Sequence, residues 1–257
     1  MGMQYSATFT PYRCLFCDGW HVSKVGEKGT VSQNTEQEVN DILSQIPIIN
    51  TQENIVLDVE KALSTDIPDI MPAYGGLRGR TLSSRRQLHR WKTLIEAGVR
   101  QVIDLRADYT STFYQELCEK CHIGYFHYPV IKGLKDIQET VELYPKFCEL
   151  IDRGNFYIAC AQGLHRTDIA LCLYWVFHAA DRGIDPPELN GYLRVKGMKP
   201  DNILRSLNEF YRYKTEKDGV PPLSPDVFKE RKDTIKKQHL KGWNNDKQQN
   251  SQEYVNK

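Results

Sequence analysis

Hydrophobic and polar positions between residues 88 and 180 follow two different periods. Apolar residues recur at helical spacing in residues 88–95 and 137–151, which predicts a helix in each. Helices are also predicted at residues 111–120 and at residues 166–180, the second of them apolar almost all round. Three shorter segments at residues 101–105, 124–128 and 155–159 are rich in β-branched and aromatic residues, which predicts strands. Pro145 falls inside the third helix, where proline costs about 3 kcal/mol, and argues against an unbroken helix there.

Strands that alternate with helices of this length predict βαβ units. Such units build a parallel sheet with helices on both faces. The sequence therefore predicts an α/β fold with a central, mainly parallel sheet flanked by helices. In open α/β sheets, ligands bind beyond the carboxyl ends of the strands. Cys160 follows the strand predicted at residues 155–159 and is therefore expected at this edge.

The pattern of polar and apolar residues divides the chain into three regions. Residues 1–70 are mixed and are expected to form an N-terminal extension that packs on the core. Residues 71–215 carry the alternating pattern and are the predicted α/β domain. Residues 216–257 become polar after Pro221 and Pro222 and are expected to form a C-terminal tail, with an exposed helix or tail at residues 229–241.

Composition narrows the class of protein. The chain has 257 residues, 40% hydrophobic and 26% charged, which is typical of a packed globular core. Its net charge of +1 gives no support to a nucleic-acid partner. The longest apolar run, residues 169–177, is too short for a membrane span. Without a secretory pattern near the N-terminus, the seven cysteines are expected to be reduced thiols in a cytoplasmic protein.

The bend that follows the third predicted strand reads CAQGLHRT, residues 160–167. If it curls so that its amides point inward at the start of the next helix, it forms a concave anion site whose field also stabilises a thiolate. Gly163 tolerates positive φ, and the planar fork of Arg166 fits two phosphate oxygens. Thr167 can donate its hydroxyl to the cysteine sulfur or cap the helix.

These groups suit one reaction, the attack of the Cys160 thiolate on a phosphate monoester. The phosphocysteine that forms is then hydrolysed by water, while the loop and Arg166 hold the equatorial oxygens. The residues expected to bind the phosphate are Ala161, Gln162, Gly163, Leu164 and Thr167. The loop itself supplies the positive field, so neither a metal nor another cofactor is expected.

Residues 160–167 resemble the C-x5-R-[S/T] signature loop of the cysteine-based protein tyrosine and dual-specificity phosphatases. The segment AGVRQVIDLR at residues 97–106 resembles the "GV..VIDLR" strand of compact members, and FHYP at residues 126–129 resembles the strand leading to their general-acid loop. The resemblance covers roughly residues 71–215. It implies a phosphorylated substrate, either a phosphoprotein or a phosphoinositide or inositol phosphate.

The general acid has two candidates. Members of the family carry an aspartate about thirty residues before the cysteine, and the matching position in this chain is Lys132. Asp136, four residues further on, is the first candidate. His165 is the second, because a histidine next to the loop arginine can titrate near neutrality. Asp104 is expected to be buried and structural, and Asp108 to serve as a turn or cap residue.

Three other interpretations remain open. Ala159 replaces the histidine that the family has before the cysteine, which together with Lys132 favours a phosphate-binding module with impaired catalysis. A rhodanese-like sulfurtransferase also places a cysteine in an anion loop. Two C-x2-C pairs, one at Cys14 and Cys17 and one at Cys118 and Cys121, have the spacing of zinc ligands.

A cluster of four arginines before the first helix is interpreted as a solvated face that could widen the positive field around an anionic substrate: Arg78, Arg80, Arg85 and Arg86.

Overall fold

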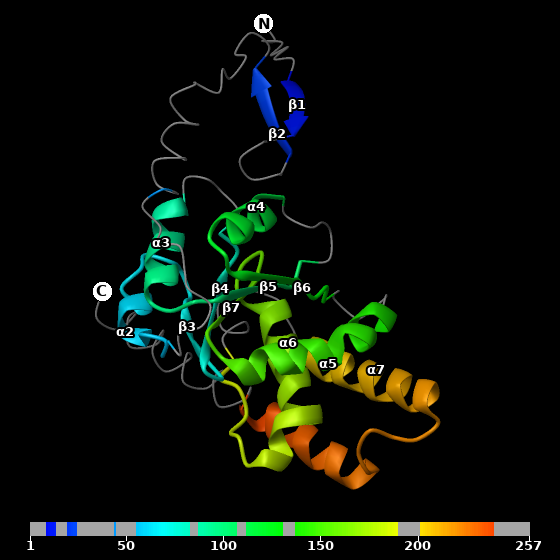
Figure 1. Cartoon of the computed structure of the whole chain (residues 1–257). Helices are drawn as coiled ribbons and strands as arrows, with labels where there is room; N and C mark the ends of the chain where they lie inside the picture. Colours follow the sequence, from blue (N-terminus) through cyan, green and yellow to red (C-terminus); the bar gives the residue numbers. More distant parts are fainter. Residues whose placement is uncertain are drawn as a thin grey trace, which may run out of the picture.

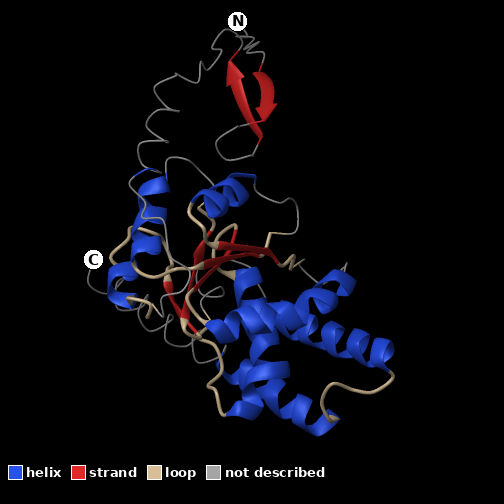
Figure 2. Cartoon of the chain, viewed as in Figure 1, coloured by secondary structure: helices blue, strands red, loops and turns tan. Residues whose placement is uncertain are grey.

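The protein has an α/β fold in which helices cover both faces of a five-stranded sheet (Figures 1 and 2). The computed structural model describes residues 9–13, 20–24, 44, 55–82, 87–106, 112–130, 137–189 and 201–238. The strands of the sheet are β3 (Met71–Ala73), β4 (Gly76–Arg80), β5 (Gln101–Asp104), β6 (Gly124–His127) and β7 (Phe156–Cys160).

The strand order is β3-β4-β7-β5-β6. Strands β4, β7, β5 and β6 run parallel, and β3 pairs antiparallel with β4 at one edge. The three predicted strands and the parallel sheet are confirmed. Strands β3 and β4 were not predicted, although β4 is the direct neighbour of the strand that ends at Cys160.

The side chains of β7 alternate between two apolar cores. The first core cluster contains Phe156, Ile158 and Cys160 and lies on the side of α5 (Ile137–Arg153), α6 (His165–Tyr174) and α7 (Asp201–Asp218). The second core cluster contains Tyr157 and Ala159 and lies on the side of α2 (Val59–Leu63), α3 (Leu88–Glu96) and α4 (Thr112–Lys120). This period of two is that of a strand buried on both faces.

The predicted helices match α3, α4, α5 and α6. Gly98, with a φ of 108°, lies just after the end of α3. The objection from Pro145 was wrong, because α5 continues through it. Pro145 is exposed, so its ring projects from the solvent face of the helix. The helix predicted at residues 166–180 changes form, from α6 to a π-helical turn at Trp175–Ala179 and a 3-10 turn at Ala180–Arg182.

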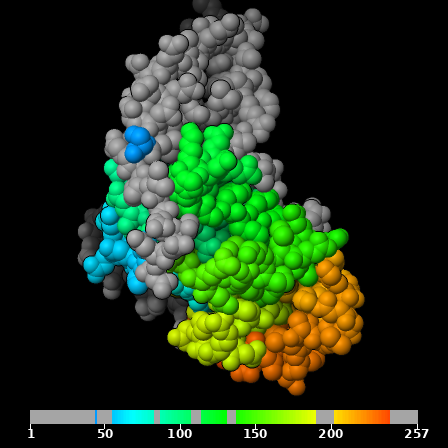
Figure 3. All heavy atoms as spheres, in the orientation of Figure 1, coloured from blue at the N-terminus to red at the C-terminus, as the bar shows by residue number. Residues whose placement is uncertain are grey.

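The polar C-terminal region contains a helix that belongs to the core. Residues 225–238 are helical, and the buried Phe228 and Ile235 join the first core cluster. Arg231, also buried, donates to the carbonyl of Val176 at 2.6 Å in the π-helical turn. The expectation of an exposed helix or tail at residues 229–241 is therefore wrong for the described residues 229–238, where Arg231 and Ile235 are buried. Figure 3 shows the orange and red surface of residues 201–238 against the yellow-green surface of the preceding segment.

Residues before the sheet also contribute to the core. Ala62 in α2 and Ile67 are buried in the second core cluster, and the backbone amide of Asp58 donates to the carbonyl of Ala97 at 2.7 Å. Strands β1 (Phe9–Arg13) and β2 (Trp20–Lys24) pair antiparallel in a separate two-stranded sheet. In the part of the chain that the structure describes, every helix is too short or too polar to cross a bilayer.

Candidate active site

Cys160 ends β7, and the loop that follows leads directly into α6. Cys160 is 3% exposed, whereas Ala161 and Gln162 are exposed, so the chain reaches the surface immediately after the thiol. His165 begins α6 and is buried, and Arg166 is half-buried in its first turn. The predicted nucleophile and phosphate clamp therefore lie at the carboxyl end of a central strand and the amino end of a helix. Oriented amides make such a position suitable for anions.

Gly163 lets the loop turn tightly against β4. Its φ is 71°, and its amide donates to the carbonyl of Cys160 at 3.0 Å. A Cβ at this position would lie 2.3 Å from the carbonyl carbon of Gly79 and 2.6 Å from the amide nitrogen of Arg80. Both the positive φ and the contact with backbone therefore require glycine.

We expect Gly163→Ala to damage the loop more than the fold. The left-handed conformation costs an alanine about 1 kcal/mol, and the clash with β4 forces the loop outward. A fall in turnover of p-nitrophenyl phosphate much larger than the loss in unfolding free energy would support this, with Gly183→Ala as the control. Gly183 has the same φ of 71° but no atom within 4 Å of the added Cβ. Equal effects of the two substitutions on turnover would contradict it.

Arg78 anchors the loop from the neighbouring strand. Its side chain is fully buried and forms an ion pair of 2.5 Å with the buried carboxylate of Asp168 in α6. Its Nη2 donates to the carbonyls of Gly163 and Leu164, both at 3.2 Å, and its Nη1 to the carbonyl of Glu188 at 2.9 Å. The interpretation of Arg78 as part of a solvated face was wrong.

The contacts of Arg78 also orient the amides of the loop. In a trans peptide, a carbonyl and the following N–H point in opposite directions. Because the carbonyls of Gly163 and Leu164 face Arg78, the amides of Leu164 and His165 point away from it. Within the described residues, the amides of Ala161, Gln162 and Leu164 donate to no protein atom. Such amides are what an anion-binding loop requires.

Thr167 follows the predicted phosphate clamp and is fully buried. Its Oγ1 has no hydrogen-bond partner among the residues that the structure describes. A buried hydroxyl in this condition is uncommon and costs free energy, so it calls for an explanation. The sulfur of Cys160 is not a hydrogen-bond partner of this hydroxyl, so the donation expected from the sequence stays a prediction.

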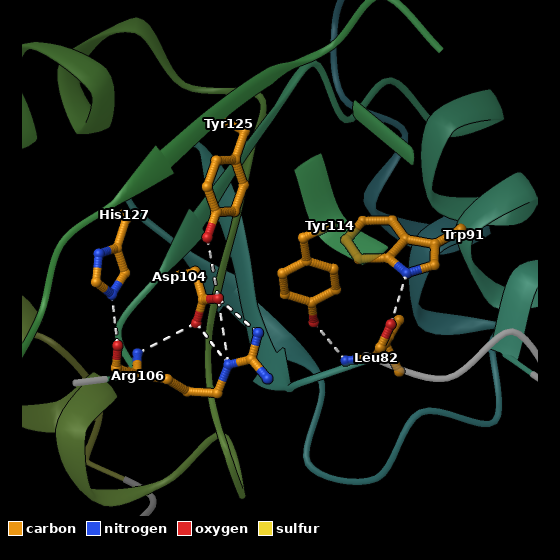
Figure 4. A network of polar contacts seen from close by, with 7 residues as sticks. All are labelled: Leu82, Trp91, Asp104, Arg106, Tyr114, Tyr125 and His127. Carbon is orange, nitrogen blue, oxygen red and sulfur yellow. Dashed lines mark hydrogen bonds and ion pairs between the residues drawn. The ribbon is translucent and has the colours of Figure 1, made fainter. Parts of the chain in front are cut away.

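A polar network fixes the ends of β5 and β6 beside this loop (Figure 4). The buried Asp104 accepts hydrogen bonds from the Arg106 amide at 3.1 Å, from its Nε at 2.9 Å and from its Nη2 at 2.6 Å. Tyr125 donates to the same carboxylate at 3.4 Å, and His127 donates from Nε2 to the carbonyl of Arg106 at 2.5 Å. Asp104 is structural, as predicted.

The same network connects to the segment after β4. The guanidinium of Arg106 lies 5.0 Å from the centre of the Tyr114 ring. The hydroxyl of Tyr114 accepts from the amide of Leu82 at 2.5 Å, and Trp91 donates to the carbonyl of Leu82 at 2.9 Å. Figure 4 shows these residues close together, although they come from the segment after β4, from α3, from the end of β5 and from α4. The carboxyl edge of the sheet is therefore held by buried polar contacts rather than by apolar packing alone.

Ala159 faces away from the loop into the second core cluster, where it pairs in register with Gly79 and Asp104. It gives the loop no polar side chain. Tyr157, on the same face, donates its hydroxyl to the carbonyl of Arg80 at 2.6 Å and so supports the end of β4.

The other four described thiols are buried in the core, as Cys160 is. Burial raises the pKa of Cys121, that of Cys148 to about 12, and those of Cys118 and Cys172 further. These four thiols are therefore protonated at neutral pH. All five cysteines in the described part of the chain are free, and no group of metal-ligating side chains occurs there.

Several predicted residues lie outside the described part of the chain: Asp136, Lys132, Asp108, Arg85, Arg86, Cys14 and Cys17. The structure brings Cys160, Arg166, Thr167 and the loop residues 161–165 together and leaves the choice of general acid as a prediction. The sequence interpretation missed the role of Arg78. The available signal was Asp168, a carboxylate in an otherwise apolar helix, which requires a buried cation.

Comparison with known proteins gives a weak similarity to solved structures. No family model matches the chain, and no curated protein matches it. Among solved structures, the crystal structure of the Yvh1 phosphatase domain from Chaetomium thermophilum aligns with 63% of this chain and 91% of that chain, at 14% identity and a TM-score of 0.33. A similarity at this level carries no conclusion about activity, so the case for a function rests on the residues described above.

Proposed function

We propose that this protein is a cysteine-dependent phosphatase of the protein tyrosine or dual-specificity type, built on a domain at residues 71–215. The observation that carries the proposal is the geometry at the end of β7. Cys160 lies at the mouth of a loop with three amides that donate to no described protein atom, and Arg166 stands in the first turn of the following helix. The resemblance of residues 160–167 to the C-x5-R-[S/T] loop points to the same chemistry.

In the proposed reaction, the thiolate of Cys160 attacks the phosphorus of a monoester and the bond to the ester oxygen breaks. The leaving alcohol takes a proton from the general acid. The loop amides and Arg166 hold the equatorial oxygens while charge moves through the transition state. Thr167 donates to the sulfur when water later attacks the phosphocysteine and releases phosphate. The charges that the reaction requires come from the chain, so neither a metal nor another cofactor enters the proposal.

The substrate is a phosphorylated molecule, either a phosphoprotein or an inositol phosphate or phosphoinositide. Ala161, Gln162, Gly163 and Leu164 contribute the backbone of the binding loop. The second candidate function is a phosphate-binding module of the same fold with impaired catalysis. It is favoured by Ala159, which faces the second core cluster and gives the loop no polar group. A rhodanese-like sulfurtransferase is the third candidate and has no further support.

The test is to trap the covalent intermediate. The protein is mixed with p-nitrophenyl phosphate, quenched within milliseconds and digested, and the peptide that contains Cys160 is examined by mass spectrometry. We expect a phosphate on Cys160 and turnover that is unchanged by a chelator. Because p-nitrophenolate leaves without protonation, even an enzyme with a poor general acid should react. If no phosphocysteine forms and no phosphate is released, the binding module is the better explanation; if a chelator abolishes turnover, the mechanism is wrong.

The general acid is assigned in the same assay with a leaving group of higher pKa. Asp136→Asn and His165→Ala are compared over pH with phenyl phosphate as substrate. The variant that lacks the acid is expected to lose the basic limb of the profile, because there the acid must be protonated to act. If neither substitution alters the profile, both candidates are excluded.

A further inference from the structure

The last residue of β4, Arg80, stands beside the candidate nucleophile. Strands β4 and β7 are parallel neighbours, and their register pairs Arg80 with Cys160 and Arg78 with Ile158. Neighbouring strands lie about 4.8 Å apart, and paired residues point to the same face of the sheet. Ile158 and Cys160 face the first core cluster, and the contacts of Arg78 with the loop and Asp168 lie on that face too. Arg80 therefore projects on the side of the sheet that carries the thiol.

The two arginines of β4 differ in what their guanidinium groups contact. Arg78 is fully buried; its guanidinium forms an ion pair with Asp168 and donates hydrogen bonds to three backbone carbonyls. Arg80 is half-buried, and its Nε, like that of Arg78, is covered without a hydrogen-bond partner among the described residues. No carboxylate in the described part of the chain forms an ion pair with it, in contrast to Arg78, Arg90 and Arg106.

A second buried polar atom without a described hydrogen-bond partner belongs to the residue that follows Arg80. The Oγ1 of Thr81 is buried and has no described hydrogen-bond partner, while the Thr81 amide donates to the carbonyl of Cys160 at 2.9 Å. Arginine remains charged at every accessible pH and offers five donors in a planar fork. Covering such donors without acceptors costs free energy, and this arrangement is typical of sites that receive an anion.

Arg166 and the loop amides already account for the phosphate that would be cleaved. A single phosphate has three nonbridging oxygens, and the proposed reaction assigns them to that loop. Arg80 belongs to β4, the neighbour of β7, whereas Arg166 follows Cys160 on α6, so the two arginines come from different elements beside the thiol. Because the loop and Arg166 are assigned to the oxygens of the cleaved phosphate, Arg80 is available for a neighbouring anionic group.

We propose that Arg80 is a specificity-determining residue that binds a second phosphate of the substrate, next to the one that is cleaved. This rests on the proposed function and deepens it. The substrate class is a monoester with a second phosphate close to the scissile one, either a free molecule such as an inositol bisphosphate or the headgroup of a lipid.

Binding is measured without turnover in the Cys160→Ser protein. Isothermal titration calorimetry at fixed ionic strength gives the Kd of orthophosphate and of pyrophosphate, which carries two adjacent phosphate groups. We expect pyrophosphate to bind about tenfold more tightly, which is the value of one charge-assisted contact. Adding Arg80→Gln should remove most of this preference, and Arg80→Lys, which keeps the charge without the fork, should retain part of it.

A matched control uses an arginine far from the loop. Arg153, at the end of α5, is exposed and pairs with Glu149, and Arg153→Gln should leave the preference for pyrophosphate unchanged. Circular dichroism confirms that each variant is folded. If Arg80→Gln does not fold, the comparison of the two anions in the Cys160→Ser protein alone still decides, because equal affinities overturn the inference.

The results separate this inference from the proposed function. If p-nitrophenyl phosphate is hydrolysed but pyrophosphate binds no better than orthophosphate, only the inference is wrong. A loss of both affinities by the same factor in Arg80→Gln also overturns it, since Arg80 would then serve the scissile phosphate. If neither anion binds and no turnover occurs, the proposed function fails.

The two sources of the second phosphate are compared in the active protein. Phosphate release is measured from a soluble inositol bisphosphate and from vesicles that contain a phosphatidylinositol bisphosphate. In either form, Arg80→Gln should lower kcat/KM more than it does with p-nitrophenyl phosphate. The faster of the two substrates identifies the source, and an equal loss on all three substrates contradicts the inference.

Discussion

Cys160→Ser is expected to reduce turnover of p-nitrophenyl phosphate by about four orders of magnitude or more while the protein remains folded. A serine hydroxyl is hardly ionised at neutral pH, so it cannot replace a thiolate as the attacking group. The change is nearly isosteric, and Cys160, although part of the first core cluster, is the last residue of β7 and is followed by the exposed Ala161. The backbone contacts of the loop, including the bond from the Gly163 amide to the Cys160 carbonyl, do not involve the sulfur.

The control is Cys121→Ser. Cys121 is also 3% exposed, but it lies in the second core cluster, and burial raises its pKa so that it remains protonated. Its substitution should cost some stability and leave kcat unchanged. Turnover is measured together with the midpoint of thermal unfolding for both variants. Activity that survives Cys160→Ser, or disappears equally in both variants, would exclude Cys160 as the nucleophile.

The sequence was sufficient to predict the strands that are themselves apolar. Strands β5 and β7 are buried along their whole length and contain the β-branched and aromatic residues that mark a strand. Strand β4 has the sequence GLRGR, and its burial depends on partners that are distant in the chain. A Cβ at Gly76 would lie 2.6 Å from the ring of Phe156, and one at Gly79 would lie 2.5 Å from the hydroxyl of Tyr157. The space beside the two glycines of β4 is filled by side chains of β7, and the local sequence of β4 gives no sign of this packing.

In the candidate site, too, the sequence could predict the residues that are contiguous in the chain but not those that come from distant segments. The loop from Cys160 to Thr167 is contiguous in sequence, so residue types and spacing were enough to place it between a strand and a helix. The groups that hold the loop come from elsewhere, and pairs such as Arg78 with Asp168 depend on the neighbour relation of β4 and β7. In the helix at residues 225–238, Phe228, Arg231 and Ile235 recur at helical spacing. That signal was present in the sequence and was outweighed by the polar composition around it.

The ion pair between Arg78 and Asp168 is expected to give the largest loss of stability of any single polar contact at the site. Both side chains are almost completely buried. Removing one partner leaves an uncompensated charge in the core, which typically costs about 3–5 kcal/mol. We expect losses of this size for Asp168→Asn and for Arg78→Met, measured by denaturation in guanidinium chloride. The exposed pair of Arg90 and Asp66 is the control, because solvent screens it, and Asp66→Asn should change stability far less.

The double variant Arg78→Met/Asp168→Asn separates the fold from the function of the loop. With both charges removed, no buried charge is left uncompensated, so the double variant should be more stable than the sum of the two single losses predicts. Activity should not recover with stability, because the carbonyls of Gly163 and Leu164 have lost the donor that turns their peptides. Misplaced loop amides typically cost about 100-fold in kcat. A double variant that regains stability and full turnover would show that Arg78 serves only the fold, whereas stability without turnover would place the orientation of the loop amides at the centre of the mechanism.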